Sequence, residues 1–220
     1  MATSGSKDYD CIIALSGGVE SVALVHYVVN VLKEKPLCMH LIFQHRDKAT
    51  SKIINKVRQH YKVDVLNSRL FFNSKGVPTF DPKAFDDQKT PDTGIWYGVA
   101  HTLAVFNPQI KKIYYGFNSG LLKRGDDHGD HDHDYADQLY ESSTNALHTL
   151  GFETKVSCPI VDFSKLELYN MIDDEVKPFV RSCIVHTKDE ACGKCHKCKE
   201  LQYVKDEYDK NQHHTNDGAS

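Results

Sequence analysis

The sequence predicts an α/β protein with a doubly wound, parallel, five-stranded sheet of the Rossmann-like kind and a C-terminal cysteine-rich helical segment. Three observations lead to this prediction. Short apolar runs alternate with amphipathic helical patterns along most of the 220 residues, as in parallel β-α-β units. The first apolar run ends in a glycine-rich turn before a helix. Four cysteines fall within 16 residues near the C-terminus.

Five apolar runs are expected to form the strands. A strand that is covered on both faces is apolar without interruption, and the first run has this character. The expected strands cover residues 10–15, 37–43, 62–66, 112–116 and 155–158.

Helices are expected between and after these strands, where apolar residues recur at intervals of three and four. In the first helix, Val22, Val25, Val28, Val29 and Leu32 share one face. The expected helices cover residues 21–32, 51–61, 94–106, 135–150, 164–176 and 198–210. This alternation implies right-handed crossovers and a ligand site at the carboxyl ends of the strands.

Two stretches interrupt the alternation. Residues 67–92 hold three prolines and several polar residues, so we expect a long loop or an insertion there. Residues 125–134 consist mainly of histidine and aspartate. They favour a mobile, solvated acidic loop, and a divalent-cation site or a lid over a nucleotide is the alternative.

The chain divides into three expected parts. Residues 9–180 form the α/β domain, residues 181–210 the cysteine-rich segment with its helix, and residues 211–220 a disordered tail. The formal net charge of −3 argues against a broad nucleic-acid-binding surface. No run reaches membrane-spanning length and no signal peptide is evident, so we expect a cytoplasmic protein with no membrane partner.

The turn after the first strand has the character of a phosphate-binding loop. Its residues are Leu15, Ser16, Gly17, Gly18, Val19, Glu20 and Ser21. Glycines let backbone N–H groups approach an anion, and the following helix adds its unsatisfied amides and the positive end of its dipole. The hydroxyls of Ser16 and Ser21 are expected to donate to phosphate oxygens. The alternative is a plain Gly-Gly turn.

The cysteine cluster has the spacing of a metal site. Its members are Cys183, Cys192, Cys195 and Cys198, which provide the four thiolates of a tetrahedral structural zinc site. Buried unrelated thiols or a redox-active Cys-x-x-Cys are the alternatives.

Together the loop and the cysteines resemble the 7-cyano-7-deazaguanine synthases, which belong to the N-type ATP pyrophosphatases and have the adenine nucleotide hydrolase type of fold. The segments that resemble this family are the Ser16–Ser21 loop, the Cys-x8-Cys-x2-Cys-x2-Cys spacing, Gly116-Phe117-Asn118, Cys158-Pro159-Ile160 with Ser164-Lys165, and Tyr135-Ala136-Asp137 with Glu141. The resemblance covers most of residues 10–205.

The resemblance implies an ATP-dependent ligase that uses Mg²⁺ and contains structural Zn²⁺. It would adenylate 7-carboxy-7-deazaguanine and convert it with free ammonia to the nitrile. It also implies a homodimer. Ser16, Glu20, Ser21 and Lys165 would be catalytic, and the loop with Phe43 and Gln44 would bind the nucleotide. Asn118, Tyr135, Asp137 and Glu141 would bind the substrate.

Departures from the family pattern keep alternatives open. Glu20 stands where the family has aspartate, and Gln138-Leu139 stand where it has Cys-Arg. The chain could therefore adenylate a different acid, a protein terminus or an RNA base, or it could be a nucleotide-binding module without turnover. Lys165 is either a cation near the phosphates or an ordinary surface lysine. Asp137 and Glu141 face the site together or are solvent-facing helix charges.

Overall fold

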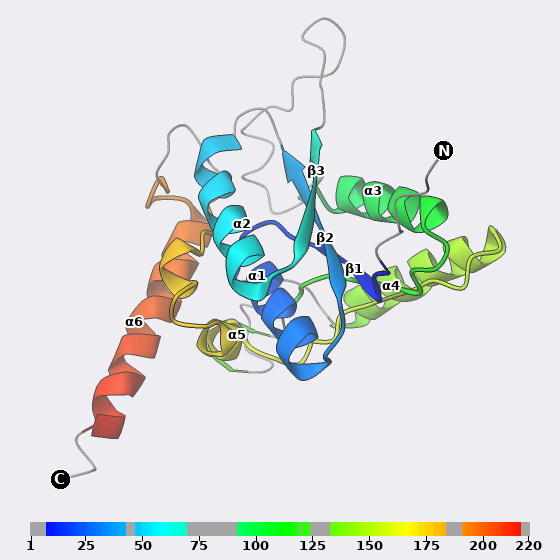
Figure 1. Ribbon diagram of the computed structural model, residues 1–220. Helices are drawn as coiled ribbons and strands as arrows, with labels where there is room; N and C mark the ends of the chain where they lie inside the picture. The colour runs from blue at the N-terminus through cyan, green and yellow to red at the C-terminus, as the bar shows by residue number, and fades with distance from the viewer. Residues whose placement is uncertain are drawn as a thin grey trace, which may run out of the picture.

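The computed structural model describes residues 8–42, 47–69, 92–118, 120–123, 133–183 and 191–216. A five-stranded parallel sheet with the order β3-β2-β1-β4-β5 forms its centre (Figure 1). The strands are β1 (Cys11–Ala14), β2 (Pro36–Ile42), β3 (Asp64–Arg69), β4 (Lys112–Tyr114) and β5 (Lys155–Ser157). The predicted fold class is confirmed, and each of the five expected strands is present.

Helices cover both faces of this sheet. They are α1 (Val19–His26), α2 (Asp47–Tyr61), α3 (Asp92–Phe106), α4 (His133–Thr149), α5 (Lys165–Met171) and α6 (His196–Asn216). Figure 1 shows α1 and α2 on one side of the sheet and α3 and α4 on the other, while α6 projects away from the sheet with the C-terminus. The chain direction across the sheet therefore reverses between β1 and β4, which is where doubly wound proteins bind ligands.

The core lies around β1. Its residues Cys11, Ile12 and Ile13 are fully buried, as expected for a central parallel strand. From α1, Val22 and Val25 are also fully buried and pack in the same cluster. The free edge of β5 is covered by α4, because the Thr144 hydroxyl accepts a hydrogen bond from the backbone N–H of Val156 at 3.0 Å. No helix in the described ranges has the length and apolar character needed to cross a membrane.

Several element ends differ from the prediction. The first helix changes to a π-helical turn over Tyr27–Val31, a local bulge that periodicity cannot reveal. The last helix of the α/β part ends at Met171 rather than at 176, since Ile172 is extended. Strand β3 takes in residues 67–69, which we expected in a loop, and α6 includes residues 211–216, which we expected to be disordered. Most of the 67–92 and 125–134 stretches lies outside the described residues.

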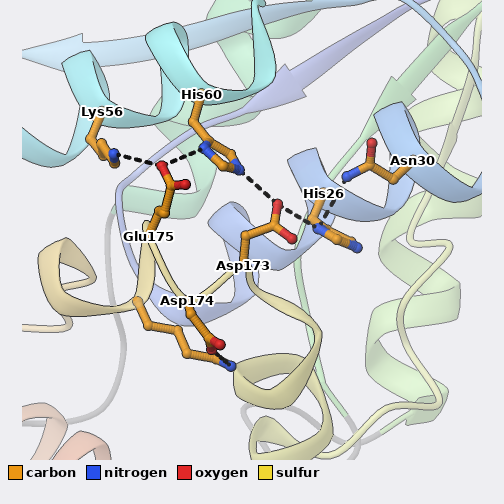
Figure 2. A network of polar contacts seen from close by, with 8 residues as sticks. His26, Asn30, Lys56, His60, Asp173, Asp174 and Glu175 are labelled. Carbon is orange, nitrogen blue, oxygen red and sulfur yellow. Dashed lines mark hydrogen bonds and ion pairs between the residues drawn. The ribbon is translucent and has the colours of Figure 1, made fainter.

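A polar cluster joins α1, α2 and the segment after α5 on the side away from the glycine-rich loop (Figure 2). Asp173 Oδ2 lies 2.9 Å from His60 Nε2 and 3.4 Å from His26 Nδ1. Glu175 Oε2 lies 3.4 Å from Lys56 Nζ. Burial disfavours the Asp173 carboxylate, but the contacts with His60 and His26 outweigh that effect and hold its pKa below the usual range.

The lowered pKa of Asp173 predicts an acid-sensitive contribution to stability. A depressed pKa stabilises the fold above the unfolded-state pKa and ceases to do so as pH falls through the folded-state value, hence below about pH 4. The Asp173 side chain is 38% exposed, so solvent screens the contribution to about 1 kcal/mol or less. We expect Asp173→Asn to lower the free energy of unfolding at pH 7 and to reduce its decline between pH 5 and pH 3.

Urea unfolding across this pH range measures the effect. The control is Asp206→Asn, which removes an exposed carboxylate on α6 that accepts a hydrogen bond from Gln202 on the same helix. Identical pH slopes for the wild type and Asp173→Asn would contradict the prediction.

Candidate nucleotide site and metal centre

The glycine-rich loop lies where the strand order reverses, directly after β1. Its first residue, Leu15, donates its backbone N–H to the carbonyl of Met39 at 2.8 Å. The Leu15 carbonyl is also 2.8 Å from Nδ1 of His40, a buried side chain of β2. These two contacts fix the direction in which the chain leaves the sheet.

Gly17 meets two requirements that only glycine satisfies. Its φ is +90°, in the region that L side chains rarely adopt, and a Cβ would lie 2.9 Å from Cγ2 of Ile53 on α2. The loop can therefore press against α2 only because position 17 has no side chain.

We expect Gly17→Ala to lower the free energy of unfolding by about 1–3 kcal/mol, the usual cost of a strained backbone. The matched control is Gly98→Ala, because a Cβ there meets nothing within 4 Å and alanine favours the helix. Chemical denaturation of the two variants checks the prediction. A Gly17→Ala protein as stable as Gly98→Ala would contradict it.

The hydroxyl of Ser21 holds the loop together from inside. Ser21 is buried, and its Oγ accepts hydrogen bonds from the backbone N–H groups of Ser16 at 3.2 Å and Gly17 at 3.1 Å. The same hydroxyl donates to the Gly18 carbonyl at 3.1 Å. These contacts make Ser21 a positioning group for the loop, and its role as a phosphate donor stays a prediction. Ser16 Oγ, which lies 3.1 Å from Ser21 Oγ, is the less enclosed of the two hydroxyls.

The amino end of α1 has no side-chain cap. Gly18 is the N-cap and provides no side-chain hydrogen bond, so the first turn relies on other partners for its amides. Gly116, at the end of β4, packs against this turn: a Cβ there would lie 3.0 Å from the carbonyl of Glu20 and 3.2 Å from the backbone nitrogen of Ser21. Glycine at position 116 thus lets β4 approach the loop closely.

Lys165 is deeply buried beside the loop, so the surface-lysine interpretation is wrong. It is 1% exposed, and its Nζ lies 2.7 Å from Oε1 of Glu20 and 3.0 Å from Oε2 of Glu200. Burying an ammonium group requires such compensation. The capping box of Ser164 and Glu167 begins α5 at this residue, and the Lys165 backbone N–H bonds the Gly120 carbonyl at 2.7 Å. Lys165 is therefore held in place from both backbone and side chain.

The four cysteines meet as the spacing predicts. The Sγ atoms of Cys183, Cys192, Cys195 and Cys198 lie within 4.8 Å of one another. Sγ atoms bound tetrahedrally to one zinc ion are about 3.8 Å apart, given a Zn–S distance of about 2.3 Å, and those of Cys192 and Cys198 are 3.9 Å apart. The cluster can therefore bind zinc.

Backbone N–H groups prepare one of these thiols for metal. Those of Lys194 and Cys195 point at Cys192 Sγ, at 3.5 and 3.4 Å, and lower the pKa of this thiol to about 6. Burial raises the pKa of Cys198 instead. A bound cation deprotonates such a thiol, so metal binding at this centre releases protons.

Asn118 carries a buried acceptor that has no partner in the part of the chain that the structure describes. The residue is 2% exposed, its Nδ2 donates to the Gly120 carbonyl, and its Oδ1 has no hydrogen-bond partner among the described residues. Buried polar atoms of this kind usually bond something. Asn118 follows β4, two residues after Gly116. Its Oδ1 therefore lies at the same edge of the sheet as the loop.

Asp137 and Glu141 line one groove between α4 and β5. The groove has a volume of about 350 Å³ and is also lined by Lys155 and Ser157. Both carboxylate residues are exposed, and the loop residues 15–21 are not among those lining the groove. Tyr140 also lines the groove, and its ring packs against that of Phe117, with ring centroids 5.8 Å apart. Phe43, Gln44 and the side chain of Tyr135 lie outside the described residues.

Sequence reasoning missed three groups around the loop. His40 carries a signal, since a histidine inside a buried parallel strand needs a polar partner. The other two groups, Glu200 and the backbone N–H of Arg181, carry no such signal in the sequence. The Arg181 N–H donates to the Gly17 carbonyl at 3.1 Å. Their role depends on contacts between distant segments.

Two comparisons with known proteins found a similarity. Residues 10–80, which include the loop and β1 to β3, match the family model described as phosphoadenosine phosphosulfate reductase domain. No curated protein matches. Among solved structures, the chain is similar to the U34-tRNA thiolase NcsA from Methanococcus maripaludis with its [4Fe-4S] cluster, with 16% identity and a TM-score of 0.49. That match covers 93% of this chain and 66% of the other, slightly less than two thirds.

Proposed function

We propose that this protein binds ATP with Mg²⁺ at residues 15–21 and adenylates an oxygen of a small substrate. The observation that carries the proposal is the uncapped amino end of α1 behind a glycine loop, at the point where the strand order reverses. The family matched by residues 10–80 is named for an adenine nucleotide, phosphoadenosine phosphosulfate, which supports the same class of ligand.

In this proposal the substrate carboxylate attacks the α-phosphorus of ATP and pyrophosphate leaves. Amides of the first turn of α1 bind the departing phosphates, and the ammonium group of Lys165, which Glu20 holds beside the loop, offsets part of their negative charge. Mg²⁺, when bound, adds positive charge to the phosphate oxygens. Ser21 keeps the loop in the binding conformation through its three backbone hydrogen bonds.

We propose 7-carboxy-7-deazaguanine as the acceptor, with ammonia as the second substrate and the nitrile as the product. The orphaned Oδ1 of Asn118 is an acceptor suited to an N–H group of such a ring. Asp137 and Glu141 could accept from guanine-like N–H groups in the groove of α4 and β5. A different acceptor is the second candidate, and the exposure of both carboxylates favours it.

Mass spectrometry of an incubation with 7-carboxy-7-deazaguanine, Mg-ATP and ammonium tests this proposal, with AMP and pyrophosphate followed in parallel. We expect the nitrile. Amide alone would mean that the second activation is missing. AMP release that depends on another acceptor would support the second candidate. ATP binding without pyrophosphate release for every acceptor would indicate a binding module.

We also propose that the cysteine centre holds zinc in a structural role. Four thiolates around one ion lie closer together than four that hold a four-iron cluster, because each thiolate of such a cluster binds a different iron. The compact grouping of the Sγ atoms therefore favours zinc. Metal analysis of protein purified without oxygen should find zinc and no visible iron–sulfur absorption. Stoichiometric iron and sulfide would overturn this assignment.

The division into an α/β domain over residues 9–180 and a cysteine segment over residues 181–210 is part of the same proposal, as are a homodimer and a cytoplasmic location. Light scattering of the purified protein tests the dimer.

A further inference from the structure

A continuous chain of ion pairs runs from the cysteine centre to the glycine loop. Lys197, which stands between Cys195 and Cys198 in the sequence, places its Nζ 3.3 Å from Oε2 of Glu200. The same oxygen is 3.0 Å from Lys165 Nζ, which in turn is 2.7 Å from Oε1 of Glu20. Positive and negative groups alternate along this path.

These groups are shielded enough to influence one another. The exposed fraction of the side chain is 2% for Lys165, 14% for Glu20 and 26% for Glu200. Water screens such contacts less than contacts on an open surface. Displacing one charged group therefore leaves the neighbouring charge without compensation. Glu200 is the shared member, since it contacts both lysines.

A backbone contact joins the same two ends. The N–H of Arg181 donates to the Gly17 carbonyl at 3.1 Å, and Cys183 follows two residues later. Gly17 is the loop residue whose φ of +90° excludes a side chain. The position of the first metal ligand and the conformation of the loop are thus linked independently of the ion pairs.

We infer that metal in the cysteine centre and nucleotide in the loop stabilise each other, and that Glu200 and Lys197 are the positioning residues that couple them. Metal fixes the start of α6, where Lys197 lies. Lys197 then positions Glu200, which positions Lys165, and Lys165 positions Glu20 in the loop. The loop then has less freedom to lose when ATP binds. Because such coupling is reciprocal, ATP must tighten metal binding by the same factor. The inference rests on the proposed ATP site.

The test measures zinc affinity by competition with a chromogenic chelator, with and without saturating Mg-ATP. The full chain is used throughout, and the affinity that the competition reports includes any folding that accompanies metal binding. We expect Mg-ATP to raise the zinc affinity of the wild type by roughly 5-fold or more, the lower end of typical coupling. In Glu200→Gln we expect this dependence on ATP to disappear.

Glu207→Gln is the matched control, because it makes the same charge change on the same helix, where the ion pair of Glu207 within the described residues is a local one with Lys210. The zinc affinity of this variant should depend on Mg-ATP as that of the wild type does. Because ATP itself also binds zinc, comparing the two variants at the same ATP concentration cancels that contribution. If Glu200→Gln does not fold, Lys197→Met removes the contact between Lys197 and Glu200 from the other side.

Calorimetric titration with ATP separates this inference from the proposed function. ATP that binds without changing zinc affinity, or full coupling retained in Glu200→Gln, would overturn only this inference. Absence of ATP binding would overturn both it and the proposed function.

Discussion

Replacing Lys165 by methionine is expected to lower the free energy of unfolding by about 3–5 kcal/mol, as when one partner of a buried ion pair is removed. The substitution leaves the carboxylates of Glu20 and Glu200 next to each other, since both lie within 3.0 Å of the lost Nζ. It should also weaken ATP binding, because the loop loses its nearest buried cation. Urea unfolding and ATP titration measure the two effects.

Lys177→Met provides the comparison for this prediction. Lys177 is also buried, with Nζ 2.7 Å from Asp174 and 3.0 Å from the hydroxyl of Tyr208. Its carboxylate partner is 85% exposed, however, and water solvates it when the lysine is removed. We expect a clearly smaller loss. Adding Glu20→Gln to Lys165→Met should recover part of the stability. Equal losses in the two lysine variants would show that charge pairing is not what holds Lys165.

The sequence allowed prediction of the sheet, the loop and the cysteine cluster because each leaves a local pattern. Continuous apolar residues mark β1, and short spacings gather Cys192, Cys195 and Cys198 in one turn. The strand-to-helix turn after β1 places the loop where the strand order reverses.

What could not be predicted depends on which distant segments meet. The side chain of Lys165 joins residues from the first and last helices, and no periodicity specifies that contact. The residue type of Ser21 predicts a phosphate ligand but does not predict its hydrogen bonds to the backbone of its own loop. Its direction into the loop depends on the backbone of Gly17, whose φ of +90° is a property of the folded turn.

Removing the metal is the second change with a large expected effect. The segment from residue 191 onward is attached to the rest of the protein mainly through α6, whose Leu201 and Val204 are buried. Binding energy of a structural zinc ion contributes directly to folding where the site is not preformed. We therefore expect chelation, or Cys183→Ser, to lower Tm by roughly 10–20 °C, which corresponds to about 5 kcal/mol for a chain of this size.

The order of events separates a structural metal from a catalytic one. Four thiolates leave no open coordination position for water or substrate, so activity should fall only as the fold loosens. Amide hydrogen exchange should therefore rise first in α6 and later in β1, and loss of activity should follow the exchange of α6. His196→Ala, which changes an exposed residue between two of the ligands, should keep both the metal and Tm. Complete loss of activity with unchanged exchange in α6 would mean that the metal takes part in the reaction itself.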